Sequence, residues 1–331
     1  MAMEGTRKAK RVEIDLQHME KTSSKAPLIL GLGELLWDVL PEGPRLGGAP
    51  ANFAVMCGRL GDQVALLSRV GWDEFGKLAL DRLETLPVDA SLVQIDSRHE
   101  TGRVTVSLEE GQPQYIIHHP AAWDSMELTE EWVRISSRAD AVCFGSLAQR
   151  GLESRQTIQT LIAQTSPSCV RVFDVNLRKP FYTSEVIEES IELATVIKMN
   201  EAEVPIVLDL LGLPIERDPQ LGDTLLLSAR RLLAEFPSLE LAAVTRGDNG
   251  SLLVTRRDSD AHPGIPTKVV DTVGASDAFT AALTHYLLRG ADLATLNEAG
   301  NRWGSWVASQ SGSMPALSEE VRTAIATAIG Q

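Results

Sequence analysis

Short apolar runs, each about the length of one β-strand, recur along the chain. They lie at residues 28–33, 64–70, 141–144, 170–175, 195–199 and 241–245. Their hydrophobicity is continuous rather than alternating, which is typical of strands covered on both faces in a parallel sheet. Helical periodicity at 52–60, 154–163, 186–194 and 224–234 predicts crossover helices between them. The pattern predicts an α/β fold with a mostly parallel central sheet flanked by helices.

Residues 101–108 break this rhythm, because apolar and polar residues alternate there at Val104, Val106 and Leu108. A turn-like stretch at 109–113 and a second apolar run at 114–118 follow. This pattern predicts an antiparallel hairpin with one face exposed or covering something. Both an ordinary sheet edge and a lid over a ligand site remain open.

The composition of the 331-residue chain narrows the class of protein. Hydrophobic residues make up 44% and charged residues 23%, and the net charge is −14. A strongly acidic chain repels phosphate backbones and anionic lipid, so we expect no nucleic-acid partner and no membrane partner. No run of about 18 apolar residues is present. Cys57, Cys143 and Cys169 stand far apart without zinc-type spacing, which fits a reducing compartment, and we expect a cytoplasmic protein.

The N-terminal stretch differs from the rest of the chain. It contains basic residues but no apolar segment, so it does not read as a secretory signal. We expect residues 1–26 to be a disordered or poorly ordered extension, and residues 27–331 to form the folded domain.

The segment 271–290 carries the strongest chemical signal. From Asp277 onward, apolar residues follow one helix face, and Gly290 is a plausible C-terminal cap. The small residues Gly274, Ala275 and Ser276 therefore lead into a helix N-terminus. Unpaired N–H groups and the helix dipole make such a terminus an anion site. Asp277 is either an ordinary N-terminal charge or a base that accepts a hydroxyl proton beside that site.

Two common phosphate-binding motifs are absent. The chain has no GxxxxGK[ST] sequence, and Gly31-Leu32-Gly33 lacks the third glycine of a dinucleotide fingerprint. A P-loop ATPase and a Rossmann dehydrogenase are therefore both disfavoured.

Four motifs in order give the chain a resemblance to a known family. They are LGGAPAN at 46–52, NEAE at 200–203, TRGDNG at 245–250 and DTVGASD at 271–277. With these motifs the chain resembles the ribokinase-like (PfkB) carbohydrate kinases from about residue 28 to its end. The stretches 31–41 and 173–182 are most similar to fructokinases. The resemblance implies a small β-sheet lid, with strands inserted within about 36–50 and 100–125.

The resemblance also implies roles for individual residues on the sugar side. Asp38 is similar to the aspartate that grips sugar hydroxyls, and Asn52 to a sugar-contacting amide. Gly47 and Gly48 match the hinge pair of the lid. Arg178 resembles an arginine near the sugar or the transferred phosphate, and a surface ion pair in a loop is the alternative interpretation.

On the nucleotide side, the resemblance implies that Asn200 and Glu203 organise Mg²⁺ around ATP, largely through water. The same pair also fits a helix-start pattern, which local sequence cannot separate from the first interpretation. Thr245, Arg246, Gly247 and Gly250 match the nucleotide loop. Family members often bind a monovalent cation through backbone carbonyls, which implies K⁺ near Asp271, Val273 and Gly312.

Ser276 departs from the family signature, where a glycine is usual. If that glycine has a positive φ, a serine there adds strain of about 1 kcal/mol or more. The serine side chain either crowds the transferred phosphate or adds a hydrogen-bond donor beside it. Either way we expect catalysis at a reduced or altered rate.

The expected activity is ATP-dependent phosphorylation of a hexose, with D-fructose giving fructose 6-phosphate. Asp277 is the expected base, and the N–H groups of Gly274, Ala275 and Ser276 are the expected anion site. A kinase for 2-keto-3-deoxygluconate or a nucleoside, and an impaired sugar- or nucleotide-binding regulatory protein, remain alternatives. A homodimer formed through the lid sheets is a further expectation from the family.

Overall fold

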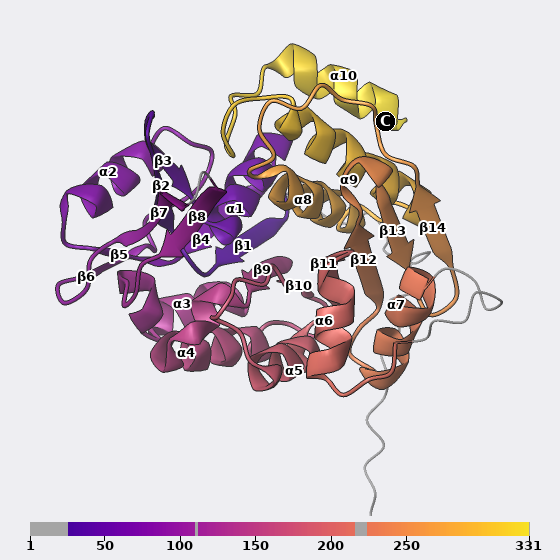
Figure 1. Ribbon diagram of the computed structural model, residues 1–331, viewed down its shortest axis with the longest axis horizontal. Coiled ribbons are helices and arrows are strands. Elements are labelled where there is room, and N and C mark those ends of the chain that lie inside the picture. The colour runs from indigo at the N-terminus through magenta and orange to yellow at the C-terminus, as the bar shows by residue number, and fades with distance from the viewer. Residues whose placement is uncertain (1–25, 110–111, 216–223, 331) are drawn as a thin grey trace, which may run out of the picture.

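A computed structural model of the protein describes residues 26–109, 112–215 and 224–330. The predicted N-terminal extension lies outside the described residues except for its last residue. Figure 1 shows a central sheet between two layers of helices, with a smaller group of strands to one side.

The central sheet, sheet A, has the strand order β14-β13-β12-β11-β10-β9-β1-β4 in the described chain. Its parallel strands are β1 (Leu28–Leu32), β4 (Gln63–Leu67), β9 (Ala141–Gly145), β10 (Val170–Asp174), β11 (Val196–Asn200) and β12 (Leu241–Thr245). The antiparallel strands β13 (Ser251–Val254) and β14 (Ser259–His262) continue one edge. The predicted mostly parallel sheet is confirmed.

Two helical layers cover the faces of sheet A (Figure 1). One contains α1 (Ala49–Leu60), α8 (Ala275–Leu287), α9 (Leu293–Ala308) and α10 (Glu319–Ile329). The other contains α3 (Glu130–Ser136), α4 (Leu152–Ala163), α5 (Ser184–Leu193), α6 (Glu203–Leu210) and α7 (Thr224–Glu235). Leu30 and Leu32 of β1 pack into one core, whereas Ile29 packs into the other. Both faces of the strand are buried, which explains its continuous hydrophobicity.

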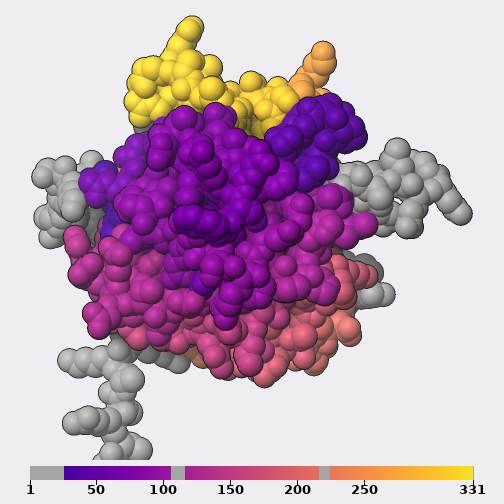
Figure 2. Space-filling view, turned by 90° about the vertical axis from the view of Figure 1, so that its left-hand side faces the viewer, coloured from indigo at the N-terminus to yellow at the C-terminus, as the bar shows by residue number. Residues whose placement is uncertain are grey.

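A second sheet, sheet B, stands beside the body. Its order is β3-β2-β7-β8, with β2 (Leu36–Leu40), β3 (Gly43–Gly47), β7 (Gly102–Glu109) and β8 (Gln112–Ile117). The pair β2–β7 is parallel, and the pairs β2–β3 and β7–β8 are antiparallel. The predicted hairpin therefore belongs to a separate sheet rather than to an edge of sheet A. Figure 2 shows this indigo-to-purple part of the chain across the face turned to the viewer.

The apolar run at 64–70, predicted as one strand, forms two. Strand β4 ends at Leu67, opposite Leu32, where its neighbour β1 also ends. Beyond Leu67 the strand has no neighbour left to pair with in sheet A, so the chain leaves the sheet. It continues as β5 (Arg69–Gly71), which pairs with β6 (Gln94–Asp96) in a two-stranded sheet next to α2 (Glu74–Leu83). Periodicity marks buried segments but does not show which sheet they join.

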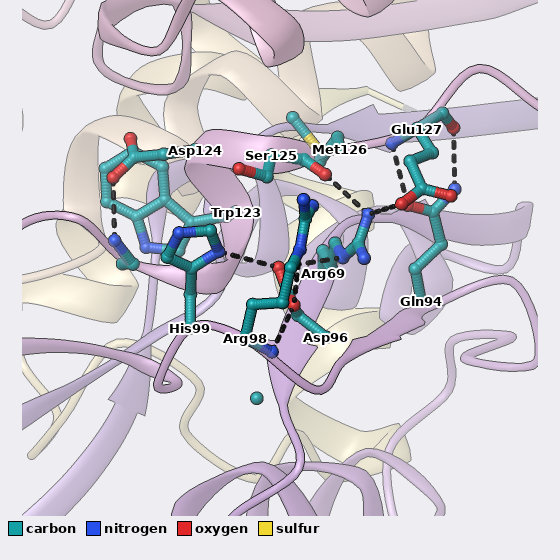
Figure 3. A network of polar contacts seen from close by, with 12 residues as sticks. Arg69, Gln94, Asp96, Arg98, His99, Trp123, Asp124, Ser125, Met126 and Glu127 are labelled. Atoms are coloured by element: carbon teal, nitrogen blue, oxygen red, sulfur yellow. Dashed lines mark hydrogen bonds and ion pairs between the residues drawn. The ribbon is translucent and has the colours of Figure 1, made fainter.

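A buried polar network fixes the place where sheet B returns to the body (Figure 3). The guanidinium of Arg69 donates to the Ser125 carbonyl at 2.6 Å and pairs with Glu127 at 2.8 Å. Its other side faces Asp96, which also contacts the His99 ring at 2.9 Å. Ser125 ends the short helix η1 (Ala122–Ser125), so the network ties β5 and β6 to the segment that follows β8.

Gly48, at the junction of β3 and α1, has a φ of +109°, and an added Cβ would lie 2.3 Å from the Glu34 carbonyl oxygen. Gly43, at the other end of β3, has a φ of +123° with nothing within 4 Å of an added Cβ. Gly48→Ala should therefore lower the free energy of unfolding by about 2 kcal/mol more than the control Gly43→Ala. Urea denaturation measures both, and equal losses would contradict the predicted clash.

Candidate active site

The N-terminal ends of α1 and α8 meet beside the carboxyl ends of the sheet A strands. The Asn52 side-chain N–H donates to the Asp277 carboxylate at 2.7 Å, and both side chains are buried. The two residues are 225 positions apart in sequence, and α1 and α8 pack against each other (Figure 1). The structure thus brings together two residues that the sequence analysis placed in different motifs.

Helix α8 begins through a left-handed residue. Gly274 has a φ of +81°, and an added Cβ would lie 2.7 Å from Cα of Ser313, so this position favours glycine both conformationally and sterically. Ala275, Ser276 and Asp277 form the first turn, where N–H groups have no partner inside the helix. With the helix dipole, this turn presents positive potential to an anion.

Ser276 is not strained, contrary to the expectation drawn from the usual glycine. It lies within α8, and its φ is not positive. The residue is exposed, and its hydroxyl accepts a hydrogen bond from the Lys198 ammonium. The serine therefore fits the helix, and its side chain has a defined charged partner.

Lys198 is a buried cation among carboxylates. Its ammonium donates to Asp174 at 3.0 Å, and the other Asp174 oxygen accepts from the Thr280 hydroxyl at 3.0 Å. Lys198 is 3% exposed. Burial alone would lower the pKa of Lys198, but the carboxylates of Asp174, Glu203 and Asp277 outweigh it and raise the pKa above its usual value. The ammonium is therefore a permanent positive charge at the ends of β10 and β11.

The electrostatic surroundings of Asp277 suit a proton acceptor. Burial raises the pKa of Asp277 to about 6, and the nearby Asp174 carboxylate adds to the rise. The hydrogen bond from Asn52 and the charges of Lys198 and Arg178 oppose it. A carboxylate with this pKa is ionised near neutral pH and is a stronger base than an exposed aspartate.

Glu34, which follows β1, is a second buried carboxyl group in the site. It is 3% exposed, and burial raises its pKa to about 7, against opposing backbone hydrogen bonds from Glu34 and Ala49. Its Oε2 atom has no hydrogen-bond partner among the described residues. Glu34 lines a cavity of about 10 Å³, room for roughly one water, together with Ser146, Asp174 and Asn176.

Sheet B contributes Asp38 from β2. Asp38 is half-buried and lies opposite Arg45 of β3, and burial raises its pKa despite the charge of Arg178. Arg45 pairs with Asp271 at 3.0 Å. Asp271 also accepts from the Val273 and Gly312 N–H groups, so sheet B contacts the loop that precedes α8. Arg178 is exposed, and its guanidinium donates to the Leu177 carbonyl at 3.1 Å.

Asn200 and Glu203 form the reciprocal helix-start pattern. The Asn200 side chain accepts from the Glu203 N–H at 2.9 Å, and Glu203 accepts from the Asn200 N–H at 2.8 Å. The second Glu203 oxygen accepts from the Leu177 N–H at 2.7 Å, and burial raises the Glu203 pKa. Each carboxylate oxygen keeps a lone pair for water, so the pair fits a magnesium ion held through water and phosphates rather than directly.

The predicted nucleotide loop connects β12 to β13. Thr245 lies opposite Asn200 in the sheet register, so the two predicted nucleotide-side motifs share one edge. The Arg246 guanidinium donates to the Ser251 and His262 carbonyls, so this side chain stabilises the turn. Gly247 has a φ of +56° with open space around it, whereas Gly250 is packed against His262.

The aromatic and histidine side chains near sheet B contact other groups of the protein. The Trp37 indole donates to the Phe75 carbonyl at 3.0 Å, and Trp123 is fully buried beneath the Arg150 guanidinium. His119 packs against Phe181, and His118 contacts Thr105.

Across the described ranges, no helix is both long and apolar enough to cross a membrane. The same residues contain no group of three His, Cys, Asp or Glu side chains arranged for a metal.

With this geometry in place, the family can be stated. The family model of the pfkB family carbohydrate kinases matches residues 43–320. The chain belongs to the pfkB family of carbohydrate kinases, and it is a sugar kinase with a ribokinase-like fold.

Individual relatives extend the comparison. The chain is 32% identical over 293 residues to the Pyrococcus horikoshii protein named "Putative sugar kinase PH1459", covering 83% of this chain and 87% of the relative. It is 30% identical over 327 residues to the Arabidopsis thaliana protein named "Probable fructokinase-7", covering 89% and 91%. A Vibrio cholerae fructokinase structure in its fructose-, ADP- and calcium-bound form is 25% identical, with a TM-score of 0.73, covering 91% and 99%.

The sequence analysis did not select Glu34, Asp174 and Lys198 as site residues. A signal existed for each. Lys198 interrupts an apolar strand, and a lysine in a buried strand requires a charged partner. Glu34 and Asp174 stand at the carboxyl ends of parallel strands, where ligands of α/β proteins bind.

Glu34→Gln tests the buried carboxyl group. Because the folded-state pKa is about 7, against a usual value of 4.5, the parent loses stability as pH rises through this interval. The variant lacks that loss, so its free energy of unfolding relative to the parent should rise by about 2–3 kcal/mol between pH 5 and pH 8. Urea denaturation at both pH values measures this difference. Exposed Glu42→Gln is the matched control, and a pH-independent difference for Glu34→Gln would contradict the assignment.

Proposed function

We propose that this sugar kinase transfers the γ-phosphoryl group of ATP to the 6-hydroxyl of D-fructose. The observation that carries the proposal is Asp277, a buried carboxylate in the first turn of α8 that accepts a hydrogen bond from Asn52. A base next to an anion site is the arrangement that phosphoryl transfer to an alcohol requires. The choice of fructose is supported by the Arabidopsis and Vibrio relatives.

The sugar side is rich in acceptors. The buried Glu34 Oε2 and Asn52 Oδ1 atoms have no partner among the described residues, and Asp38 adds a half-buried carboxylate. Hydroxyl groups are the natural donors to such atoms. The carboxyl groups of Asp38 and Asp277 repel a negatively charged substrate, which favours a neutral hexose over the sugar acid 2-keto-3-deoxygluconate. Gly47 and Gly48 let the backbone approach the sugar, and Arg178 lies close enough to influence these two carboxyl groups and that of Glu34.

In the proposed reaction, Asp277 accepts the proton of the attacking hydroxyl. It is ionised above about pH 6, so turnover falls as the pH drops below that value. The N–H groups of Gly274, Ala275, Ser276 and Asp277 stabilise the charge on the transferred group. Sheet B excludes the water that would otherwise hydrolyse ATP.

ATP binds on the side of the site away from the sugar residues. There, Thr245, Gly247 and Gly250 form the nucleotide loop. Arg246 shapes this loop rather than gripping a phosphate, because its guanidinium is directed to two carbonyls. Asn200 and Glu203 would hold Mg²⁺ through water, and the bound ion would neutralise part of the phosphate charge. We also propose a potassium ion near the carbonyls of Asp271, Val273 and Gly312. The protein is proposed to be cytoplasmic and to form a homodimer through sheet B.

Asp277→Asn should reduce fructose-dependent ADP release by at least about 100-fold, because it removes the proton acceptor and keeps the side-chain size. The measurement is a coupled ADP-release assay with Mg·ATP and a sugar panel led by fructose. Asp292→Asn, an N-cap carboxylate of α9, is the matched control and should retain the parent rate. ADP release on 2-keto-3-deoxygluconate or a nucleoside, and not on fructose, would overturn the substrate assignment. Full activity in Asp277→Asn would overturn its role as base.

A further inference from the structure

The hydroxyl of Ser276 accepts a hydrogen bond from an ammonium group and keeps its own proton available. It lies in the first turn of α8, immediately before Asp277, in an exposed residue. A hydroxyl has one proton to donate and two lone pairs, whereas an ammonium can only donate. The bond to Lys198 therefore occupies a lone pair of the serine oxygen. The hydroxyl proton has no acceptor among the described residues and is available to another group.

Lys198 gives this hydroxyl its direction and its polarity. The ammonium is fixed by Asp174 at 3.0 Å, and Asp174 is in turn fixed by Thr280 at 3.0 Å. All three of these supporting side chains are buried. A hydroxyl that accepts from a cation becomes a stronger donor, because hydrogen bonds in a chain polarise one another. The buried Lys198 ammonium therefore polarises the hydroxyl of Ser276, which is an exposed residue.

We propose that Ser276, polarised by Lys198, is a catalytic residue that donates a hydrogen bond to the transferred phosphoryl group. The inference rests on the proposed kinase reaction and assigns a further donor within it. The donor adds to the backbone N–H groups of the α8 first turn, and it stabilises charge on the same phosphoryl oxygens. A glycine at this position, usual in the signature that 271–277 resembles, supplies no such donor. Lys198 is a positioning residue that acts through the serine.

Three variants of Ser276 separate a donor from a mere space-filling residue. Ser276→Ala and Ser276→Gly remove the hydroxyl, and Ser276→Thr retains it. Both hydroxyl-free variants should lower kcat by at least about tenfold with little change in the KM for fructose, because the bond acts on the transferred group. Ser276→Thr should keep most of the parent activity. Ser184→Ala is the matched control, because Ser184 is an exposed serine in the first turn of α5.

Lys198→Met tests the chain of contacts. If the cation acts through Ser276, adding Ser276→Ala to Lys198→Met should lower kcat by less than about twofold further. A full additional tenfold loss would show that Ser276 acts independently of Lys198. Because Lys198→Met leaves the buried Asp174 unpaired and threatens folding, the Ser276 series alone also decides the role of the hydroxyl.

A binding measurement keeps the inference independent of the sugar. Beryllium fluoride with ADP imitates the γ-phosphoryl group, and calorimetry gives its affinity without turnover. Ser276→Ala should weaken the binding of ADP with beryllium fluoride by at least about fivefold, and leave the affinity for ADP alone unchanged. A parent that phosphorylates no sugar would refute the proposed function, while this comparison would still test the donor. Equal beryllium fluoride affinities, or a Ser276→Gly variant as fast as the parent, would overturn the role of Ser276.

Discussion

The hydrogen bond between Asn52 and Asp277 is the contact on which the site depends. It joins the first turns of α1 and α8, two helices that pack side by side on one face of sheet A. Gly48 precedes one helix and Gly274 precedes the other, and both glycines have a positive φ. The contact removes Asp277 from water without leaving it unpaired, and burial raises its pKa to about 6.

The carboxyl groups buried with Asp277 at the ends of the sheet A strands need a positive charge beside them. Glu34, Asp174, Glu203 and Asp277 would be costly to bury together, and the Lys198 ammonium offsets part of that cost. Burial raises the pKa of Glu34 to about 7, whereas Asp174 is directly paired with Lys198. The site therefore contains carboxyl groups in different protonation states near neutral pH, one suited to hold a proton and one suited to accept it.

Much of the fold could be predicted from the sequence, because strands buried on both faces leave a continuous apolar signal. Strands β6, β13 and β14 were missed, and β5 was taken as the end of a longer strand, since short strands carry weak periodicity. The motifs predicted that Asn52 and Asp277 belong to one site. They did not predict the hydrogen bond between them, because 225 positions separate the two residues. The Lys198–Ser276 contact is also a product of the fold. The strain expected of a serine is absent because the φ of Ser276 is not positive. Arg246 was predicted to belong to the nucleotide loop, but its hydrogen bonds to the Ser251 and His262 carbonyls could not be read from the sequence.

The central claim is that Asp277 directs phosphoryl transfer to a sugar hydroxyl rather than to water. The most direct measurement is phosphorus NMR of the reaction of the parent protein with Mg·ATP and fructose. The predicted result is one new phosphomonoester, fructose 6-phosphate, formed in step with ADP. Inorganic phosphate as the main product, or a phosphate on another hydroxyl, would contradict the claim.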